Sequence, residues 1–345
     1  MATLDRRRFL HRSAAAGIGA SGLTALMANG AQARKGGRGN TPIEAPDNGG
    51  YGELQPDPVL ALPAGFSYVR FGETGDIMSD GIATPSKHDG MAAFPGPGSQ
   101  VRLVRNHEEN AGPPFAQPAY DQAAGGGTTN LVYDTARREL VHDNASLSGT
   151  VRNWAGGPTP WGSWLTCEEN TSTRDEPHGY LFEVPADAEG VVEPVALKEM
   201  GRFVHEACAV DPATGIVYET EDRGMSGFYR FLPDAPGDLA AGGRLQMLAV
   251  KDRPAYDTRN DQRVGKPLPV TWVDIDDPDP ANAYEDPRAV HKQGVAKGGA
   301  TFARLEGCWY GDGSIFFNAT SGGDAGLGQV WEYRPRGNSG GQLIL

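Results

Sequence analysis

The chain has 345 residues, of which 39% are hydrophobic, and it carries a formal net charge of −13 at pH 7. A chain of this length can bury a large core, as one big domain or as two. The acidic balance excludes a nucleic-acid partner, which requires a basic surface. It is compatible with a site in which carboxylates hold cations, although an acidic soluble surface explains most of these charges by itself.

The first 33 residues have the pattern of an export signal. Paired arginines at 6–8 precede an apolar pair, an Ala/Gly-rich stretch runs from Ser13 to Met27, and Ala31-Gln32-Ala33 supplies a cleavage site. The paired arginine favours the twin-arginine route, so we expect a periplasmic or extracellular protein that meets the twin-arginine translocase during export. A basic amphipathic helix is the alternative. No segment has the roughly 20 apolar residues needed for a stable membrane span.

Residues 34–56 are rich in glycine, proline and asparagine and predict a linker, which leaves 57–345 as the main domain. The 48 glycines and 26 prolines are scattered, which suits many short strands joined by turns. Three cysteines are an odd number for an exported protein. At least one thiol must therefore stay free, pair between chains or bind a metal.

Four units repeat one order of short strands. The first strand is expected to begin near His88, Arg152, His205 and Arg304. Second strands are expected at 101–105, 163–167, 216–220 and 314–318, third strands at 131–133, 180–182, 228–231 and 330–333, and fourth strands at 139–141, 195–197, 244–247 and 342–344. Four antiparallel strands repeated at roughly 50 residues, or a multiple, predict an all-β fold of the β-propeller type. A β-sandwich is the alternative, but it does not explain the repeat.

The fourth unit continues to Leu345, and larger propellers have more than four units. We therefore expect that C-terminal blades are absent from this sequence. An unclosed propeller would leave sheet edges unpaired, which proteins normally avoid.

In a propeller, the start of each first strand and the end of each second strand lie on one face near the axis. This sequence places acidic and other metal-binding groups there, at 88–90, 152–153, 205–206 and 304–307 and at 105–110, 167–170, 219–222 and 318–320. Converging carboxylates repel one another unless cations or protons neutralise them. Oxygen ligands suit calcium, whereas a thiolate calls for a softer transition metal. Cys167, which precedes two glutamates, therefore indicates iron or zinc beside calcium.

Each of these residues also has an ordinary structural interpretation. A single glutamate at a strand end is commonly a solvated turn residue, and only the coincidence across four units argues otherwise. Cys167 could be a buried core residue, and the apolar neighbours of Cys208 and Cys308 favour a structural role. His107 and His205 could be ligands or hydrogen-bonding braces. Arg304 could form a plain ion pair with Glu306 or bind phosphate in a bidentate manner.

Six stretches resemble the PhoX-type alkaline phosphatases: 103–108, 156–169, 201–207, 218–222, 227–231 and 304–307. The resemblance implies a six-bladed β-propeller that holds iron and calcium and hydrolyses phosphate esters. It also implies that Cys167, Glu206 and Glu306 are iron ligands and that Arg304 clamps phosphate. Further ligands implied by the resemblance are Glu108, Glu168, Glu169, Glu221 and Asp222.

No serine or threonine lies in a convincing nucleophile motif. The expected nucleophile is a metal-bound oxygen whose pKa the cations lower, while Arg304 holds phosphate oxygens. Residues two apart in a regular strand point the same way, so we expect Arg304 and Glu306 to face one polar centre. The rival functions are a calcium-dependent propeller lactonase or esterase, and a non-catalytic propeller that binds a partner.

Overall fold

The computed structural model describes residues 51–337 and 339–345. The predicted signal peptide and most of the predicted linker lie outside the described residues. The chain divides between Tyr68 and Val69 into two compact units. In the described part of the first, β1 (Leu54–Gln55) pairs antiparallel with β2 (Leu62–Pro63). No helix among the described residues has the length and apolar character needed to cross a membrane.

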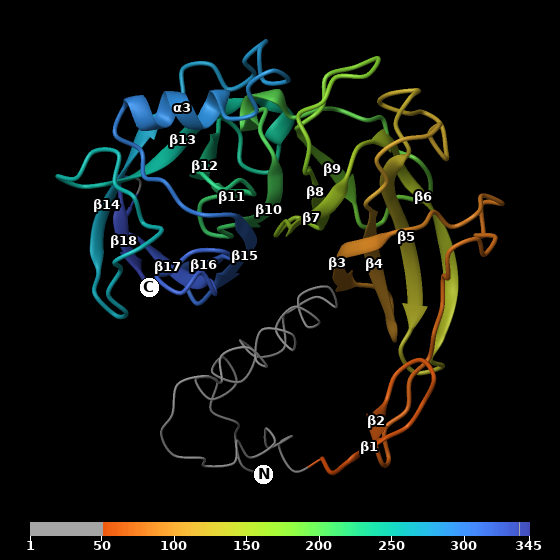
Figure 1. The fold of residues 1–345 in the computed structure, drawn as a ribbon. Helices are drawn as coiled ribbons and strands as arrows, with labels where there is room; N and C mark the ends of the chain where they lie inside the picture. The colour runs from red at the N-terminus through yellow and green to blue at the C-terminus, as the bar shows by residue number, and fades with distance from the viewer. Residues whose placement is uncertain (1–50, 338) are drawn as a thin grey trace, which may run out of the picture. The chain divides into compact units, whose positions relative to one another are not determined.

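The second unit, Val69–Leu345, is built from four antiparallel groups of strands, called blades 1 to 4 below (Figure 1). Blade 1 contains β3 (His88–Pro95), β4 (Gln100–His107), β5 (Gly126–Asp134) and β6 (Glu139–Thr150). Blade 2 contains β7 (Asn153–Pro158), β8 (Ser163–Glu168) and β9 (Leu181–Pro185). Blade 3 contains β10 (His205–Val210), β11 (Val217–Glu221), β12 (Phe228–Pro233) and β13 (Gly243–Val250). Blade 4 contains β15 (Leu305–Gly311), β16 (Ser314–Ala319), β17 (Gln329–Pro335) and β18 (Gly341–Ile344).

The predicted first strands begin within one residue of their observed starts, and the second and third strands also lie where the repeat placed them. The fourth strand predicted at 195–197 is wrong. There Leu197 donates one backbone hydrogen bond to Leu181, and the chain then turns into the 3-10 helix η1 (Lys198–Met200), which buries Met200. A single hydrogen bond does not make a ladder, so blade 2 has three strands.

The strand β14 (Leu268–Asp274) was not predicted, and it changes the sheet edges. It pairs with β13 on one side and with β18 on the other, so blades 3 and 4 form one nine-stranded sheet. The expected unpaired outer edges are therefore covered in these two blades, because β14 satisfies the backbone groups of both. Its buried residues alternate (Leu268, Val270, Trp272), which is the period of a strand and was a usable signal.

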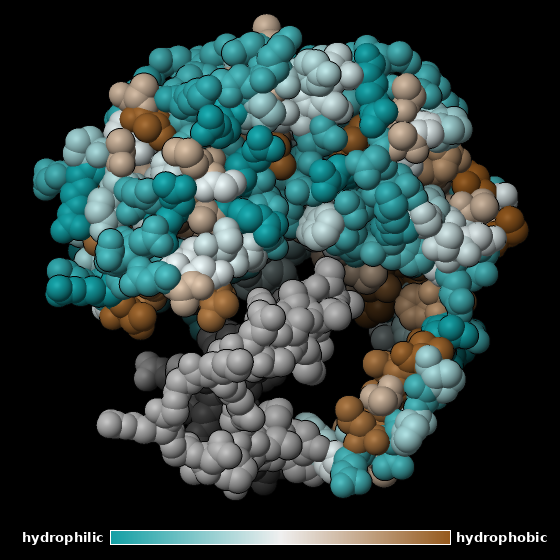
Figure 2. Space-filling view, viewed as in Figure 1, coloured by the Kyte–Doolittle hydropathy of each residue, from teal (hydrophilic) through white to brown (hydrophobic). Residues whose placement is uncertain are grey.

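Apolar layers between neighbouring blades form the core. Phe94, Val104 and Trp164 pack where blades 1 and 2 meet. A larger layer joins blades 3 and 4, in which the rings of Phe228 and Phe317 stack with centroids 4.0 Å apart. Outside these layers the visible surface is mostly hydrophilic, in keeping with the acidic composition (Figure 2). Helix α3 (Ala289–Ala296) packs on β13 and was not predicted.

Candidate functional site

Every first strand carries a β-bulge at the same place. In blade 1, His88 pairs with His107 and Met91 pairs with Arg105, so three residues of β3 advance against two of β4. The same shift occurs between Asn153 and Gly156, between His205 and Cys208, and between Leu305 and Cys308. A bulge inserts one residue and re-aims its side chain, and bulges are common beside active sites. The four blades therefore present one equivalent bulge position each.

The first bulge residue is acidic in three blades: Asp89, Glu206 and Glu306, with Trp154 in blade 2. A small residue follows each of them. At Gly90 an added Cβ would lie 2.8 Å from the backbone of Trp154 and Ala155, because the next blade approaches closely. The repeat placed Asp89, within 88–90, on the acidic face, but it was not among the residues predicted individually as ligands. The repeated acidic–small pair in the first strands was the signal that could have identified it.

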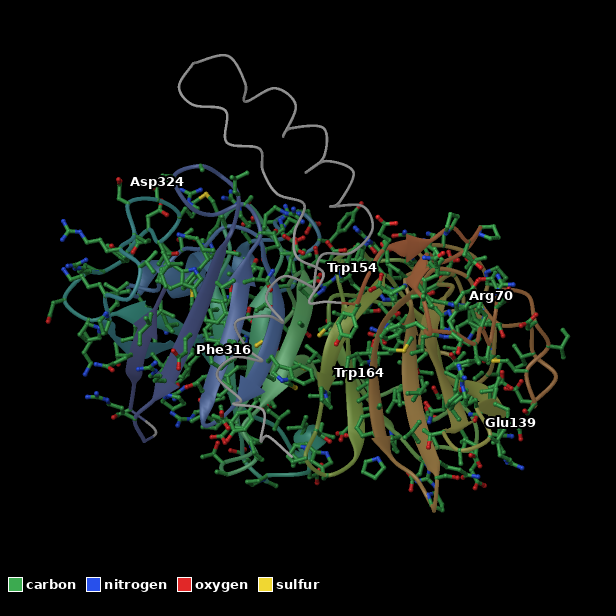
Figure 3. All side chains as sticks on the ribbon, turned by 90° about the horizontal axis from the view of Figure 1, so that it is seen from below. Arg70, Glu139, Trp154, Trp164, Phe316 and Asp324 are labelled. Atoms are coloured by element: carbon green, nitrogen blue, oxygen red, sulfur yellow. The ribbon has the colours of Figure 1, made fainter. Side chains whose placement is uncertain are left out.

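Figure 3 shows Trp154 near the middle of the second unit, whereas Arg70, Glu139 and Asp324 lie at its periphery. Trp154 is partly buried, and it stands where the other three blades contribute a carboxylate. The ring of bulge positions is therefore acidic on three sides and apolar on the fourth.

A second equivalent position follows each second strand: Glu108, Glu169, Asp222 and Thr320. The backbone N–H of each donates to the carbonyl of the residue before the first strand, at 2.9, 3.0, 3.1 and 2.9 Å respectively. Those preceding residues are Lys87, Arg152, Val204 and Arg304. The three basic ones have left-handed backbones, with φ between 49° and 50°. The repeat thus sets basic side chains directly beside acidic ones.

Glu169, Glu206 and Asp222 form the centre of the site, the carboxylate trio. One oxygen from each lies within 4.8 Å of the other two. Glu169 directly follows the second strand of blade 2, while Glu206 and Asp222 belong to blade 3, so the trio forms only when the two blades meet. All three were predicted as ligands from the sequence, and the structure brings them together. Whether they bind a metal stays a prediction.

Burial and the repulsion of neighbouring carboxylates raise the pKa of two members of the trio, Glu169 and Glu206. Burial, with the charges of Asp222 and Glu108, raises the pKa of Glu169 to about 7 although Arg152 opposes the shift. Burial and then the charges of Glu169, Glu306, Asp222 and Asp89 hold the pKa of Glu206 well above its ordinary value. Such a cluster requires protons or cations for neutrality. Converging carboxylate oxygens are the donor set of a hard cation such as calcium, so the residues fit that ion.

Protein stripped of cations should become less stable as the pH rises from about 5 to about 8. A glutamate of ordinary pKa 4.5 that titrates at about 7 in the fold binds more protons in the folded state over this window. Stability therefore falls with rising pH. Calcium should remove the slope by neutralising the trio. Melting temperatures at pH 5 to 8, in chelator and in millimolar calcium, measure the effect, and Glu169→Gln should flatten the chelator curve. Parallel curves with and without calcium would contradict this.

Arg304 bridges the trio and Glu306. Its Nε and Nη2 donate to the two oxygens of Asp222 at 3.0 and 2.8 Å, and Nη2 also lies 2.7 Å from Glu306 Oε1. The prediction that both residues face one centre is right in outcome, but its reason is wrong. Arg304 precedes β15, in a left-handed conformation, and the bulge turns Glu306 towards it. No regular strand alternation is involved.

Arg152 is the counterpart of Arg304 in blade 2 and was missed as a site residue. Its Nη2 lies 2.7 Å from Glu169 Oε2 and its Nε lies 3.5 Å from Glu108 Oε1. Glu108 is therefore placed at the rim, one ion pair away from the trio. The equivalent position of the two arginines, immediately before a first strand, was visible in the repeat.

Glu168 and Glu221 are also equivalent to each other, as the last residues of their second strands, and both are fully buried. Glu168 accepts hydrogen bonds from the backbone of Val151, Gly179 and Tyr180 and contacts His178 Nδ1 at 2.7 Å. Glu221 Oε2 accepts from the Gly227 N–H and the Tyr229 hydroxyl, both at 2.8 Å. The structure does not bring either into the trio, and these contacts brace loops. Their predicted ligand role is untested.

Cys167 lies opposite a bulge, at the position that Asn106 and Thr220 occupy in blades 1 and 3. Those two side chains donate to the bulged backbone of the next blade, Asn106 to Trp154 O at 3.1 Å and Thr220 to Glu306 O at 2.6 Å. By this equivalence Cys167 faces the bulge of blade 3, which carries Glu206. Burial, contact with the Cys208 thiol, and the charges of Glu219 and Glu206 raise the pKa of Cys167.

The remaining candidates have structural partners. The three cysteines are all free and buried in the structure as described. Cys208 and Cys308 pack in the apolar layers. His107 contacts Ser86 O and Thr129 Oγ1 at 2.9 and 3.0 Å, which is the environment of a brace. His205 donates from Nε2 to Gly201 O at 3.0 Å.

The blades and the acidic cluster at one end of their inner strands define a β-propeller protein with a carboxylate-rich centre. The solved structure of Pseudomonas fluorescens PhoX, in complex with the transition-state analogue vanadate, shares this fold with a TM-score of 0.53. The identity is 16%, and the match covers 75% of this chain and 66% of that one, so this chain spans less than two thirds of its length. The predicted propeller is thereby confirmed.

A family profile described as Alkaline phosphatase PhoX matches residues 49–343. The chain therefore belongs to the PhoX alkaline phosphatase family, and the resemblance predicted from the sequence is confirmed. No curated protein sequence matches the chain significantly.

Proposed function

We propose that this protein is an exported, metal-dependent phosphatase that hydrolyses phosphate esters. The observation that carries the proposal is the carboxylate trio with Arg304 bonded to one of its members, because this places a cation-binding donor set beside a phosphate-binding guanidinium. Membership of the PhoX family supports it. The vanadate complex of the Pseudomonas fluorescens protein supports the same class of chemistry.

Glu169, Glu206 and Asp222 would together hold cations such as calcium, with Glu306 and Asp89 as the nearest further carboxylates. Glu206 and Glu306 are the carboxylates that the family resemblance assigns to iron. Cys167, which faces the Glu206 bulge, is the soft donor expected for iron. When bound, these cations would supply Lewis acidity towards the phosphoryl oxygens and the attacking water. Arg152 and Arg304 stabilise the surrounding carboxylates and so keep the ligand oxygens in position.

Arg304 is the group that would hold the phosphoryl group. Asp222 and Glu306 fix its guanidinium from two sides through Nε and Nη2, and among the described residues Nη1 has no acceptor. A fixed planar fork with a free donor suits a non-bridging phosphate oxygen. The guanidinium is already held in place before substrate binds, so it needs little reorganisation when negative charge develops on the phosphoryl oxygens.

The proposed location is the periplasm or the extracellular space. The paired arginines before an apolar stretch support twin-arginine export. That route carries folded proteins, so the blades and their metals could be assembled before translocation.

Protein purified from a twin-arginine-competent host should contain both calcium and iron, and it should hydrolyse p-nitrophenyl phosphate. Chelation should abolish the activity because the trio then lacks cations. Elemental mass spectrometry and steady-state kinetics on the same preparation measure this. Calcium without iron, together with lactone hydrolysis, would support a lactonase instead. Metal-free protein with no hydrolytic activity would support a binding propeller.

A further inference from the structure

A basic depression adjoins the trio on the side of blades 3 and 4. It has a volume of about 420 Å³ and is lined by Asp222, Arg223, Gly224, Met225, Arg288 and Arg304. We call it the arginine depression. Its lining comes from three places in the sequence: the loop after β11, the residue before α3 and the residue before β15. Arg304 and Asp222 belong both to this depression and to the site described above.

The charges that line the depression are unbalanced. Three guanidiniums meet a single carboxylate, Asp222, which is already engaged by Arg304 in a bidentate pair. The Arg288 side chain donates only to the sulfur of Met225, at 3.3 Å, and the Arg223 side chain has no ion pair or hydrogen bond among the described residues. Both guanidiniums act on the buried Glu221 only at longer range, and Arg288 acts in the same way on Asp286. In a chain of net charge −13, two neighbouring guanidiniums that contact no carboxylate side chain in the described part of the chain are unexpected. They provide donors for an anion that the protein itself does not supply.

The depression is built on fixed backbone. Arg304 N–H donates to Arg223 O at 2.8 Å, and Ser226 and Phe302 exchange backbone hydrogen bonds of 3.1 and 2.9 Å. The buried Glu221 holds the far end of the loop through Gly227 N–H. Because the loop is tied to blade 4 and to its own strand, Arg223 is presented from an ordered segment. A preorganised site loses less entropy when a ligand binds.

We propose that the arginine depression binds the second anionic group of the substrate, so that the preferred esters carry two phosphate groups or more. This inference rests on the proposed function, since a phosphoryl group held at Arg304 defines where the second group falls. The ligand class includes sugar bisphosphates and nucleoside diphosphates. An ester with a neutral leaving group leaves Arg223 and Arg288 unpaired.

The first test measures the affinity of the depression for anions, which can be determined whether or not the protein is catalytic. Titration calorimetry with the metal-loaded full chain should show tighter binding of pyrophosphate than of orthophosphate. In Arg223→Gln and in Arg288→Gln this preference should fall about fivefold each, and further in the double variant, as expected for partly exposed charge pairs. Arg263→Gln, an exposed arginine in a separate depression, is the matched control and should leave the preference unchanged.

The second test is kinetic. The ratio of kcat/KM for glucose 1,6-bisphosphate to that for glucose 6-phosphate should fall in the same variants, chiefly through KM. If neither ester is hydrolysed, the proposed function fails while the pyrophosphate preference still reports on the depression. The inference would be overturned if the preference for pyrophosphate over orthophosphate were the same in all variants as in the native chain. It would also be overturned if Arg263→Gln reduced this preference as much as Arg223→Gln or Arg288→Gln.

Discussion

Replacing Arg304 with alanine should lower kcat/KM for a chromogenic phosphate ester roughly tenfold to a few hundredfold, because a charge-assisted hydrogen bond is worth on the order of 1.5–3 kcal/mol. Metal content should stay the same or rise. The guanidinium neutralises Asp222 and Glu306, so its removal makes the cluster more negative and more attractive to cations. Steady-state kinetics and elemental analysis of one preparation measure both quantities.

Two further variants separate a phosphate clamp from a structural brace. Arg304→Lys should recover only part of the activity, since an ammonium cannot reproduce the planar fork between Asp222 and a phosphate. Glu306→Gln should differ in kind and deplete metal, because it removes a carboxylate from the cluster. If Arg304→Ala loses metal as severely as Glu306→Gln, the arginine is a brace and the clamp assignment is wrong.

Replacing Cys167 with serine should remove iron and lower activity together, by at least about tenfold. Replacing a residue that only hydrogen-bonds to a metal ligand commonly costs 10- to 100-fold in metal affinity or activity. Replacing a ligand itself should therefore cost at least as much. A serine hydroxyl is a harder and far less acidic donor than a thiol. Calcium content should change less than iron, since the trio remains.

The structure selects Cys308→Ser as the control for this experiment. Cys308 is buried in the layer between blades 3 and 4, with its sulfur 3.9 Å from Tyr218 O, and it should affect stability alone. Cys208 is a poorer control because its thiol contacts Cys167. Full iron content and full activity in Cys167→Ser would show that this thiol is not a ligand.

The blades were predictable because their signals are local. Strand alternation and Gly/Pro turns repeat within each unit, so the inner strands were located to within a residue. The same local signals placed Glu169, Glu206 and Asp222 on one acidic face, because each lies beside the end or start of such a strand, and the family resemblance then selected them as ligands. The prediction of a strand at 195–197 was wrong because a local β-rich run does not show whether a neighbouring strand is available to pair with it.

Local sequence patterns were enough to recognise the family, the repeat and the kind of side chain at each inner strand end. Which of these side chains meet depends on the folded arrangement of the blades. The bulges turn Asp89, Glu206 and Glu306 towards the cluster, and the approach of blade 2 to blade 3 completes the trio. The fold also buries Glu168 and Glu221 outside the trio, where each accepts hydrogen bonds from loop backbone. These outcomes depend on one residue of register and on contacts between distant segments, and neither is encoded in local periodicity.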